Sequence, residues 1–223
     1  MPKLGFVHTI LPLVDYFDRL AEKELPGVER LHILDEPLLK RVMERGHLLP
    51  ADTERLAGHV ETAADAGAQA VLVTCSTLSP CVEDLRQQGA ALPVFKIDEA
   101  MFDDALRRGR VIGILATNPA TMRPTREGLL ATARLYGLED EIDLEEKLVE
   151  EALEALKAGD SLKHDAIIAQ AGKELASRCD VVIFAQASMA RAASKVPEPE
   201  RRKILTSPET ALGSVAALLK DER

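Results

Sequence analysis

The sequence predicts an α/β protein made of two similar halves, each with a parallel sheet covered by helices on both faces. Three observations carry this prediction: apolar strand-like segments alternate with helical ones, the apolar segments are short and continuous, and two motifs recur at similar spacing. Short continuous apolar strands are typical of a sheet that is buried on both faces. With 223 residues and 46% hydrophobic content, the chain is long enough to bury a full core.

The expected strands are runs of mainly aliphatic residues, at 4–9, 31–34, 70–75, 94–97, 110–117 and 181–186. The expected helices have apolar residues at helical spacing, and they lie at 53–66, 81–88, 99–108, 145–158 and 161–177. Around 145–158 the apolar positions expected on one helical face are Leu144, Leu148, Ala152, Leu153 and Leu156. The many charges of this stretch are interpreted as a solvated face.

An internal repeat divides the chain. The segment "KLGFVHT" (3–9) is similar to "VIGILAT" (111–117), and "AVLVTCST" (70–77) is similar to "VVIFAQAS" (181–188). The two motifs of the first half are separated by nearly the same number of residues as the two motifs of the second half, which indicates two related halves. We expect a first half at 1–98, to which 206–223 returns, and a second half at 99–205.

Polar residues follow several of these strands. In an open parallel sheet the ligand binds beyond the carboxyl ends of the strands, so Thr9, Cys75, Thr117 and Gln186 are expected to face a shared cleft. In "AVLVTCSTLSP", Ser79 is expected to be the N-cap of a helix and Pro80 its first residue. The free N–H groups of such a turn favour a carboxylate or a thiolate.

Cys75 therefore has two interpretations, a catalytic base or nucleophile and an ordinary buried cysteine. Cys81 is the rival thiol, because an early helical position also lowers the pKa of a thiol, but its side chain is expected to pack back along the helix. Cys179 precedes a strand and is expected to be structural. The three cysteines have no CxxC or CxxH spacing, which indicates a reduced, cytoplasmic protein without a disulfide framework or a zinc site.

Charge and termini limit the partners. A net charge of −9 and a pI near 5.2 argue against a nucleic-acid surface or an anionic membrane surface, both of which need clustered Lys and Arg. The first 18 residues have no apolar run long enough to span a bilayer, and Asp15 and Asp18 do not fit a signal peptide. We expect small molecules or protein as partners.

At these residues the chain resembles the aspartate/glutamate/hydantoin racemase superfamily, over nearly its full length. The motifs that carry the resemblance are "VLVTCST" with the Ser-Pro that follows, "GILATNPATM" (113–122), "LGFVHT" and "VVIFAQAS". The resemblance implies two pseudo-symmetric α/β halves with the active site in the cleft between them, usually in a dimer. It implies no pyridoxal phosphate, nicotinamide or metal, which agrees with the lack of GxGxxG, P-loop and HExxH motifs.

The racemases that the chain resembles use two cysteines, one per half, on opposite sides of the α-carbon of the substrate. A thiol with an ordinary pKa of about 8.5 removes such a weakly acidic hydrogen only if the carbanion is stabilised as it forms. The resemblance makes Cys75 the base or nucleophile. It also gives a set of substrate-binding residues: His8, Thr9, Ser76, Thr77, Thr117, Asn118, Thr121 and Ser188. For the hydroxyl residues the alternative is turn and helix capping, and for His8 it is a hydrogen-bonded structural histidine.

The sequence departs from the racemase pattern at two places. The position aligned with Cys75 in the second half is Gln186, which cannot act as a base, and the first motif reads Cys-Ser-Thr where many relatives have Cys-Asn-Thr. We therefore expect a cofactor-independent enzyme with one cysteine, which isomerises, deprotonates from one side or decarboxylates a small carboxylate, with Gln186 holding a carboxylate or oxyanion. The alternatives are a true racemase with another second base, such as His8 or a water held by Gln186, and a binding protein without activity.

Overall fold

The computed structural model of the protein describes residues 1–221, which form two compact units. The first unit comprises Met1–Ile97 and the chain from Pro208 onward, and the second comprises Asp98–Ser207. Each unit contains one four-stranded sheet in which all paired strands are parallel, with the orders β2-β1-β3-β4 and β6-β5-β7-β8. The predicted α/β class is confirmed, and the two sheets have equivalent connections.

The first unit builds its sheet from four short strands: β1 (Lys3–His8), β2 (Glu29–Leu34), β3 (Ala70–Val73) and β4 (Val94–Lys96). Its helices are α1 (Pro12–Glu24), α2 (Glu36–Arg45), α3 (Pro50–Asp65), the short 3-10 turn η1 (Ser76–Leu78), α4 (Ser79–Gln88) and α10 (Ser207–Asp221). Side chains of α2, α3 and α4 form one apolar cluster with Val7, Val71 and Val73. Successive strand residues point to opposite faces, so Phe6 lies on the other face, where it packs against Phe17 of α1.

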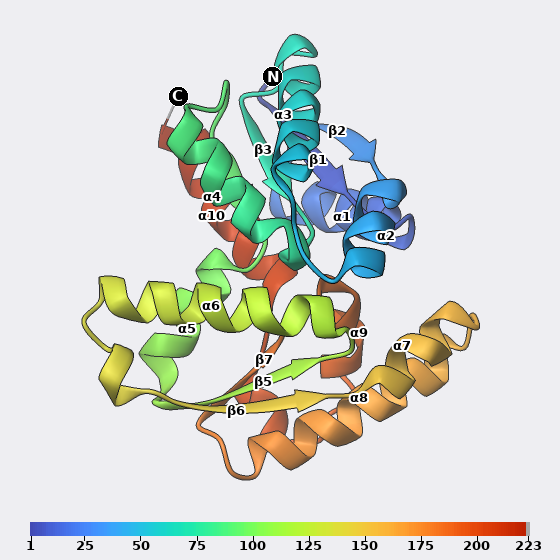
Figure 1. The fold of residues 1–223 in the computed structure, drawn as a ribbon, viewed down its shortest axis with the longest axis vertical. Helices are drawn as coiled ribbons and strands as arrows, with labels where there is room; N and C mark the ends of the chain where they lie inside the picture. Colours follow the sequence, from blue (N-terminus) through green and yellow to red (C-terminus); the bar gives the residue numbers. More distant parts are fainter. Residues whose placement is uncertain (222–223) are drawn as a thin grey trace. The chain divides into compact units, whose positions relative to one another are not determined.

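The second unit repeats this plan. Its strands are β5 (Val111–Ala116), β6 (Asp143–Leu148), β7 (Val181–Phe184) and β8 (Ile204–Thr206). Its helical segments are α5 (Glu99–Arg108), α6 (Pro119–Leu135), η2 (Glu139–Glu141), α7 (Glu150–Lys157), α8 (Ser161–Ala176), η3 (Ala187–Met189), α9 (Ala190–Ala193) and η4 (Glu200–Lys203). One apolar cluster joins this sheet to α7, α8 and α9, and another joins it to α5 and α6. Figure 1 shows α6 over one face of this sheet and α8 under the other.

The predicted helix at 145–158 is wrong in its first turn. Residues Asp143–Leu148 form β6, an edge strand paired along its length with β5, and the helix begins only at Glu150. Edge strands carry charges on their exposed side, so a charged segment pairs here in spite of its helical spacing. Ion pairs from Lys147 to Glu174 and from Arg178 to Glu145 join the charged side of β6 to α8 and to the turn that follows it.

The turn after β3 also differs from the expectation. The strand ends at Val73 rather than at Cys75, and α4 begins at Ser79, so that Leu78 and not Ser79 is its N-cap residue. Ser79 and Pro80 are therefore the first two helical residues. The extra turn η1 lies between the strand and the helix, and it is this turn that positions the residues after Cys75.

Candidate active site

Cys75 lies at the carboxyl end of the first sheet, immediately before η1. The neighbouring strands β1 and β3 pair Val7 with Val73, and the N–H of Thr74 continues the ladder by donating to the carbonyl of Val7 at 3.0 Å. The carbonyl of Cys75 then accepts the first hydrogen bond of η1, from the N–H of Leu78 at 2.9 Å. This fixed backbone places the Cys75 thiol beside the end of β1, and 8% of the residue is exposed.

The thiol of Cys75 is surrounded by hydrogen-bond donors. Burial raises the pKa of this thiol, while hydrogen bonds from the Thr9 hydroxyl, from the N–H groups of Leu78 and Thr77 and from the Thr77 hydroxyl lower it. The net pKa lies above the ordinary value because burial outweighs the donors. The sequence predicts that this loop stabilises a thiolate; the donors are present, but in the free protein the thiol form is favoured.

Ser76 adds an unused polar group to the same loop. The residue is 5% exposed, and its Oγ has no hydrogen-bond partner in the described part of the chain. A buried hydroxyl without a partner costs about 1–3 kcal/mol, so native proteins rarely keep one without a use. The hydroxyl of Ser76 is thus a buried donor beside the Cys75 loop whose hydrogen bond is not used within the described residues.

Gln186 has the same backbone position in the second unit as Cys75 has in the first. Here β5 and β7 pair Leu115 with Phe184, and the N–H of Ala185 donates to the carbonyl of Leu115 at 2.9 Å. The carbonyl of Gln186 accepts from the N–H of Met189 at 2.9 Å, which begins η3. The two residues also share an extended backbone before their 3-10 turns, with φ of −126° at Cys75 and −128° at Gln186. Pairing register thus gives the same equivalence as the sequence repeat.

The side chain of Gln186 is bound to Thr117. Its Oε1 accepts from the Thr117 N–H at 2.7 Å, and its Nε2 donates to the Thr117 hydroxyl at 2.9 Å. Asn118 caps helix α6 by accepting from the N–H of Ala120 at 3.0 Å, as the capping alternative expects. Thr121 is buried nearby in the first turn of the same helix, and Ser188 lies half-buried in η3. The structure brings Thr117 and Gln186 together, and Asn118 serves the helix.

His8 and Cys75 point to opposite faces of the first sheet. Cys75 belongs to the apolar cluster on the side of α2, α3 and α4, whereas the His8 ring stacks on Phe6 and lies beside Phe17 of α1. Both ring nitrogens are engaged inside the unit, Nδ1 with the Thr74 hydroxyl and Nε2 with His32, each at 2.9 Å. Burial, with the nearby His32, lowers the pKa of His8 to about 3, so its ring is neutral near pH 7. These contacts agree with the structural alternative for His8.

The other two thiols are also buried; Cys81 accepts one hydrogen bond, from the Thr53 hydroxyl, and Cys179 has charged neighbours but no hydrogen bond to its sulfur among the causes of its pKa shift. Cys81 is 1% exposed, and burial raises its pKa to about 11, so the expected lowering by its early helical position is wrong. Cys179 is 2% exposed, and its Sγ packs so closely over Gly113 that a Cβ added there would lie 3.1 Å from the sulfur. All three cysteines are free. Cys75 alone among them has the surrounding donors that a reacting thiolate needs.

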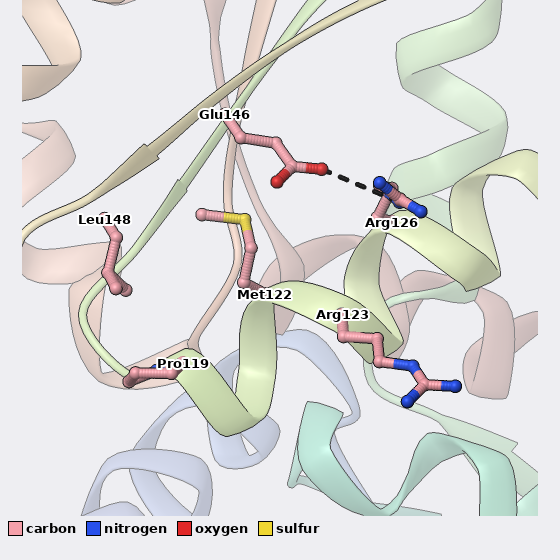
Figure 2. Close-up of a pocket in the computed structure, with 6 residues that line it drawn as sticks. All are labelled: Pro119, Met122, Arg123, Arg126, Glu146 and Leu148. Carbon is pink, nitrogen blue, oxygen red and sulfur yellow. Dashed lines mark ion pairs between the residues drawn. The ribbon is translucent and has the colours of Figure 1, made fainter.

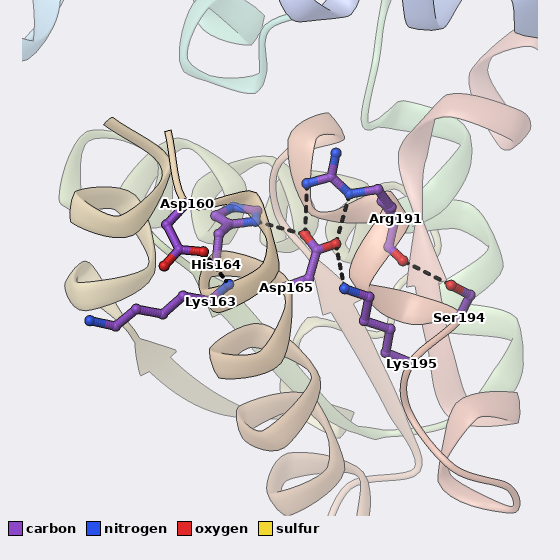
Figure 3. A network of polar contacts seen from close by, with 7 residues as sticks. All are labelled: Asp160, Lys163, His164, Asp165, Arg191, Ser194 and Lys195. Atoms are coloured by element: carbon purple, nitrogen blue, oxygen red, sulfur yellow. Dashed lines mark hydrogen bonds and ion pairs between the residues drawn. The ribbon is translucent and has the colours of Figure 1, made fainter. Parts of the chain in front are cut away.

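Sequence reasoning missed a buried carboxylate in the second unit. Asp165 of α8 accepts from Arg191 at 2.7 and 3.0 Å, from Lys195 at 2.9 Å and from Nδ1 of His164 at 2.9 Å, as Figure 3 shows. Burial alone raises the pKa of this carboxyl, but the hydrogen bonds, that of Arg191 first, lower it overall. Arg191 lies in α9, directly after η3, so Asp165 anchors the segment that follows Gln186. An acidic residue among the charges of a helix gives no sequence signal for this role.

A surface hollow of about 530 Å³ lies beside the start of α6. Figure 2 shows its lining, which consists of Pro119, Met122, Arg123, Arg126, Glu146 and Leu148. Arg126 pairs with Glu146 at 3.7 Å, and Arg123 pairs with Glu127 at 2.7 Å. The hollow contains none of the predicted site residues, and its cations are matched by carboxylates, so we assign it no ligand.

Residues 1–221 contain no group of three or more His, Cys, Asp and Glu side chains that is placed to hold a metal ion. Among the helices of these residues, none is long and apolar enough to cross a membrane.

The comparisons with known proteins agree with this geometry. The family model "Asp/Glu/Hydantoin racemase" matches residues 13–212. A comparison with curated protein sequences gave no match. Among solved structures, a glutamate racemase from Francisella tularensis in complex with D-glutamate is similar with a TM-score of 0.71 and 16% identity, covering 99% of this chain and 82% of that one.

Two further solved structures show the same fold. An allantoin racemase from Klebsiella pneumoniae matches with a TM-score of 0.70 and 16% identity, over 100% of this chain and 89% of that one. A glutamate racemase from Bacillus anthracis matches with a TM-score of 0.69 and 15% identity, over 99% and 82%. The family match spans most of the sequence, and it confirms the resemblance and the isomerase class inferred from the motifs. The chain belongs to the Asp/Glu/hydantoin racemase family.

Proposed function

We propose that this chain is a cofactor-independent enzyme that moves a proton at the α-carbon of a small carboxylate, with Cys75 as its single reacting thiol. The observation that carries the proposal is the Cys75 loop, where four donors surround the sulfur and the Ser76 hydroxyl is buried without a partner. The family membership supports the chemistry, and two of the similar structures are glutamate racemases. Cofactor independence, a cytoplasmic location and a homodimer stay predictions from the sequence.

The proposed step is a single proton transfer. The Cys75 thiolate takes the hydrogen of the α-carbon, the C–H bond breaks, and the electron pair moves into the substrate carboxylate as an enediolate. The N–H groups of Thr77 and Leu78 and the hydroxyl of Thr9 stabilise the thiolate before the transfer. The Ser76 hydroxyl is the group free to donate to the developing charge on the substrate. The new thiol exchanges its proton for one from solvent, and the reverse transfer of this solvent proton to carbon, as the electron pair returns from the enediolate, completes exchange on the same face.

The raised pKa of Cys75 serves this chemistry. A thiolate whose conjugate acid is weaker is a stronger base, which a weakly acidic C–H bond requires. The cost is that little thiolate exists near neutral pH in the free protein, because burial disfavours the charged form. We therefore expect an enzyme that is slow at pH 7 and faster at alkaline pH.

Gln186 makes the reaction one-sided in this proposal. In the racemases that the chain resembles, the second base comes from the position that Gln186 occupies, and an amide neither gives nor takes a proton in the accessible pH range. His8 is a poor replacement base, because both of its nitrogens are engaged and its pKa is about 3. That Cys75 and Gln186 face one cleft stays a prediction. No observation favours the decarboxylase alternative.

A solvent-exchange screen tests the proposal. The protein is incubated in D₂O with amino acids, dicarboxylic acids and malonates, and loss of the α-proton signal is followed by NMR. We expect exchange of at least one acid, its loss in Cys75→Ala and its retention in Cys81→Ala, which removes a buried thiol that has no part in the proposed step. Exchange that persists in Cys75→Ala would overturn the proposal. Protection of Cys75 from alkylation by an acid that never exchanges would instead support a binding protein.

A further inference from the structure

A chain of four polar side chains runs through the first unit, from the surface of α1 to the residue before Cys75. Asp18 Oδ1 lies 3.3 Å from His32 Nε2, His32 Nδ1 lies 2.9 Å from His8 Nε2, and His8 Nδ1 lies 2.9 Å from the Thr74 hydroxyl. The Thr74 hydroxyl is also 3.2 Å from the carbonyl oxygen of Val7, to which it can donate. The series thus has four hydrogen-bond links. Its two ends, the Asp18 carboxylate and the Val7 carbonyl, can only accept hydrogen bonds.

This series of hydrogen bonds has one proton too few when both histidine rings are neutral. Each link needs one proton, so four are required. Two neutral histidines supply one N–H each and Thr74 supplies one O–H, which makes three. With both rings neutral, one link must therefore place two acceptors against each other. One added proton, which makes one ring an imidazolium, fills all four links.

The positions of the groups decide which link is empty in the neutral chain. If the link between Asp18 and His32 lacked a proton, an unprotonated imidazole nitrogen would face the Asp18 carboxylate, and the two acceptors would repel strongly. An empty last link costs less, because the Val7 carbonyl already accepts from the Thr74 N–H at 3.0 Å. The neutral chain therefore runs outward: the Thr74 hydroxyl donates to His8, His8 donates through Nε2 to His32, and His32 donates to Asp18.

The added proton belongs on His32 rather than His8. The charged groups that face the chain are Asp18, from α1, and Arg30, from β2, which donates to the same Asp18 oxygen at 2.7 Å. The His32 side chain is 17% exposed and lies against that carboxylate, whereas His8 is fully buried between Phe6 and Phe17. A buried ring with no carboxylate partner is the costlier place for a charge.

We propose that Asp18 and His32 are positioning residues for the Cys75 loop, because one proton taken up by His32 reverses every hydrogen bond from His32 to Thr74. In the protonated chain His32 donates to His8, His8 donates through Nδ1 to Thr74, and the Thr74 hydroxyl turns to the Val7 carbonyl. His8 changes tautomer without becoming charged. Thr74 then holds the end of β1 by two hydrogen bonds instead of one, directly before Cys75 on the chain.

The reversal itself is independent of catalysis, and only its effect on exchange rests on the proposed function of Cys75. The test is therefore NMR of the full-length protein with ¹⁵N-labelled histidine, because imidazole nitrogen shifts identify the protonated nitrogen. At high pH the His8 proton is expected on Nε2. As His32 titrates, that proton is expected on Nδ1, and the backbone amide signal of Cys75 is expected to shift over the same pH range.

Three variants sharpen the test. Asp18→Asn removes the carboxylate beside His32 and is expected to lower the pH at which the reversal occurs, because the added proton loses its nearest negative charge. Asp15→Asn, which removes an exposed carboxylate earlier on the same helix, is the matched control and should leave the midpoint in place. Thr74→Val leaves Nδ1 of His8 without an acceptor and should hold the proton on Nε2, whereas Thr74→Ser should restore the change.

Two results would overturn the proposal. One is a His8 proton that stays on the same nitrogen while His32 titrates, or a His8 ring that becomes charged with it. The other is a Cys75 amide signal that does not move across the transition, which would remove the positioning role. Absence of α-proton exchange with every acid tested would count against the proposed function alone, because the tautomer measurement needs no substrate.

Discussion

Replacing Ser76 by alanine is expected to stabilise the free protein and to weaken its binding of a ligand. The Oγ of Ser76 is buried and without a partner, and burying such a hydroxyl costs about 1–3 kcal/mol. Alanine removes that cost and leaves a gap of one oxygen atom, whose lost contacts return part of it. The net gain is about 1 kcal/mol, which corresponds to about 2–4 °C in Tm for a chain of this size.

Thermal unfolding with and without an acid that exchanges its α-proton in the D₂O screen measures both effects. A ligand that binds the folded state raises Tm in proportion to its affinity, so the rise should be smaller in Ser76→Ala than in the unaltered protein. Thr125→Val is the matched control, because Thr125 is fully buried in α6 and its hydroxyl also has no partner among the described residues. It should raise the Tm of the free protein without changing the effect of the ligand.

A lower Tm of the ligand-free alanine variant would contradict this prediction, since it would mean that the Ser76 hydroxyl stabilises the fold. An equal rise in Tm with ligand in both proteins would likewise remove Ser76 from the binding site.

Two further predictions follow from the pKa shifts. Because burial raises the pKa of Cys75, the rate of α-proton exchange should keep rising with pH above about 8.5, the ordinary thiol value, and a plateau reached near pH 7 in a pH–rate profile would contradict the buried thiol. Asp35 caps α2, and although burial raises its pKa, hydrogen bonds from Arg55 and His59 lower it overall to about 2. It therefore stabilises the fold above the unfolded pKa near 3.9, and this contribution disappears as pH falls through about 2. Asp35→Asn should lower the free energy of unfolding by about 1–2 kcal/mol at pH 7, after allowing for water around the half-exposed Arg55. Urea unfolding at pH 7 and pH 3 should show a smaller difference between the variant and the unaltered protein at pH 3.

The sequence predicted the parts of the fold that depend on local pattern. The apolar runs at 70–75 and 181–186 became β3 and β7, and the repeat in the sequence reappears as two sheets with the same strand order. Strand β6 could not be found this way. Its apolar residues fit helical spacing together with those that follow, and only pairing with β5 at a sheet edge makes it a strand.

The candidate site was predictable in position but not in detail. A polar residue after a buried strand identified Cys75, and the repeat identified Gln186 as its equivalent. The contact of Thr9 with the sulfur depends on how η1 turns the chain, and no pattern in the sequence specifies that turn. The sign of the Cys75 pKa shift depends on the balance of burial against four donors, which the sequence alone does not specify.

The histidine pair illustrates the same limit. His8 and His32 are 24 residues apart in sequence, and they meet because β1 and β2 pair Phe6 with His32, which sets the His32 ring beside those of Phe6 and His8. The sequence alone does not single out His32, because a histidine in an edge strand has no distinctive neighbours in the chain. Strand register, which a single sequence does not specify here, created the link.

Exchange of each enantiomer of one substrate in D₂O, followed separately by NMR and chiral chromatography, tests directly whether the proton transfer is one-sided. With Cys75 as the one thiol and an amide at Gln186, one enantiomer should exchange its α-hydrogen with retention while the other stays unlabelled, and Cys75→Ala should abolish the exchange. Gln186→Cys should add exchange of the second enantiomer. Exchange of both enantiomers at similar rates by the unaltered protein, with racemisation, would contradict the account, because it would require a second base that Gln186 does not supply.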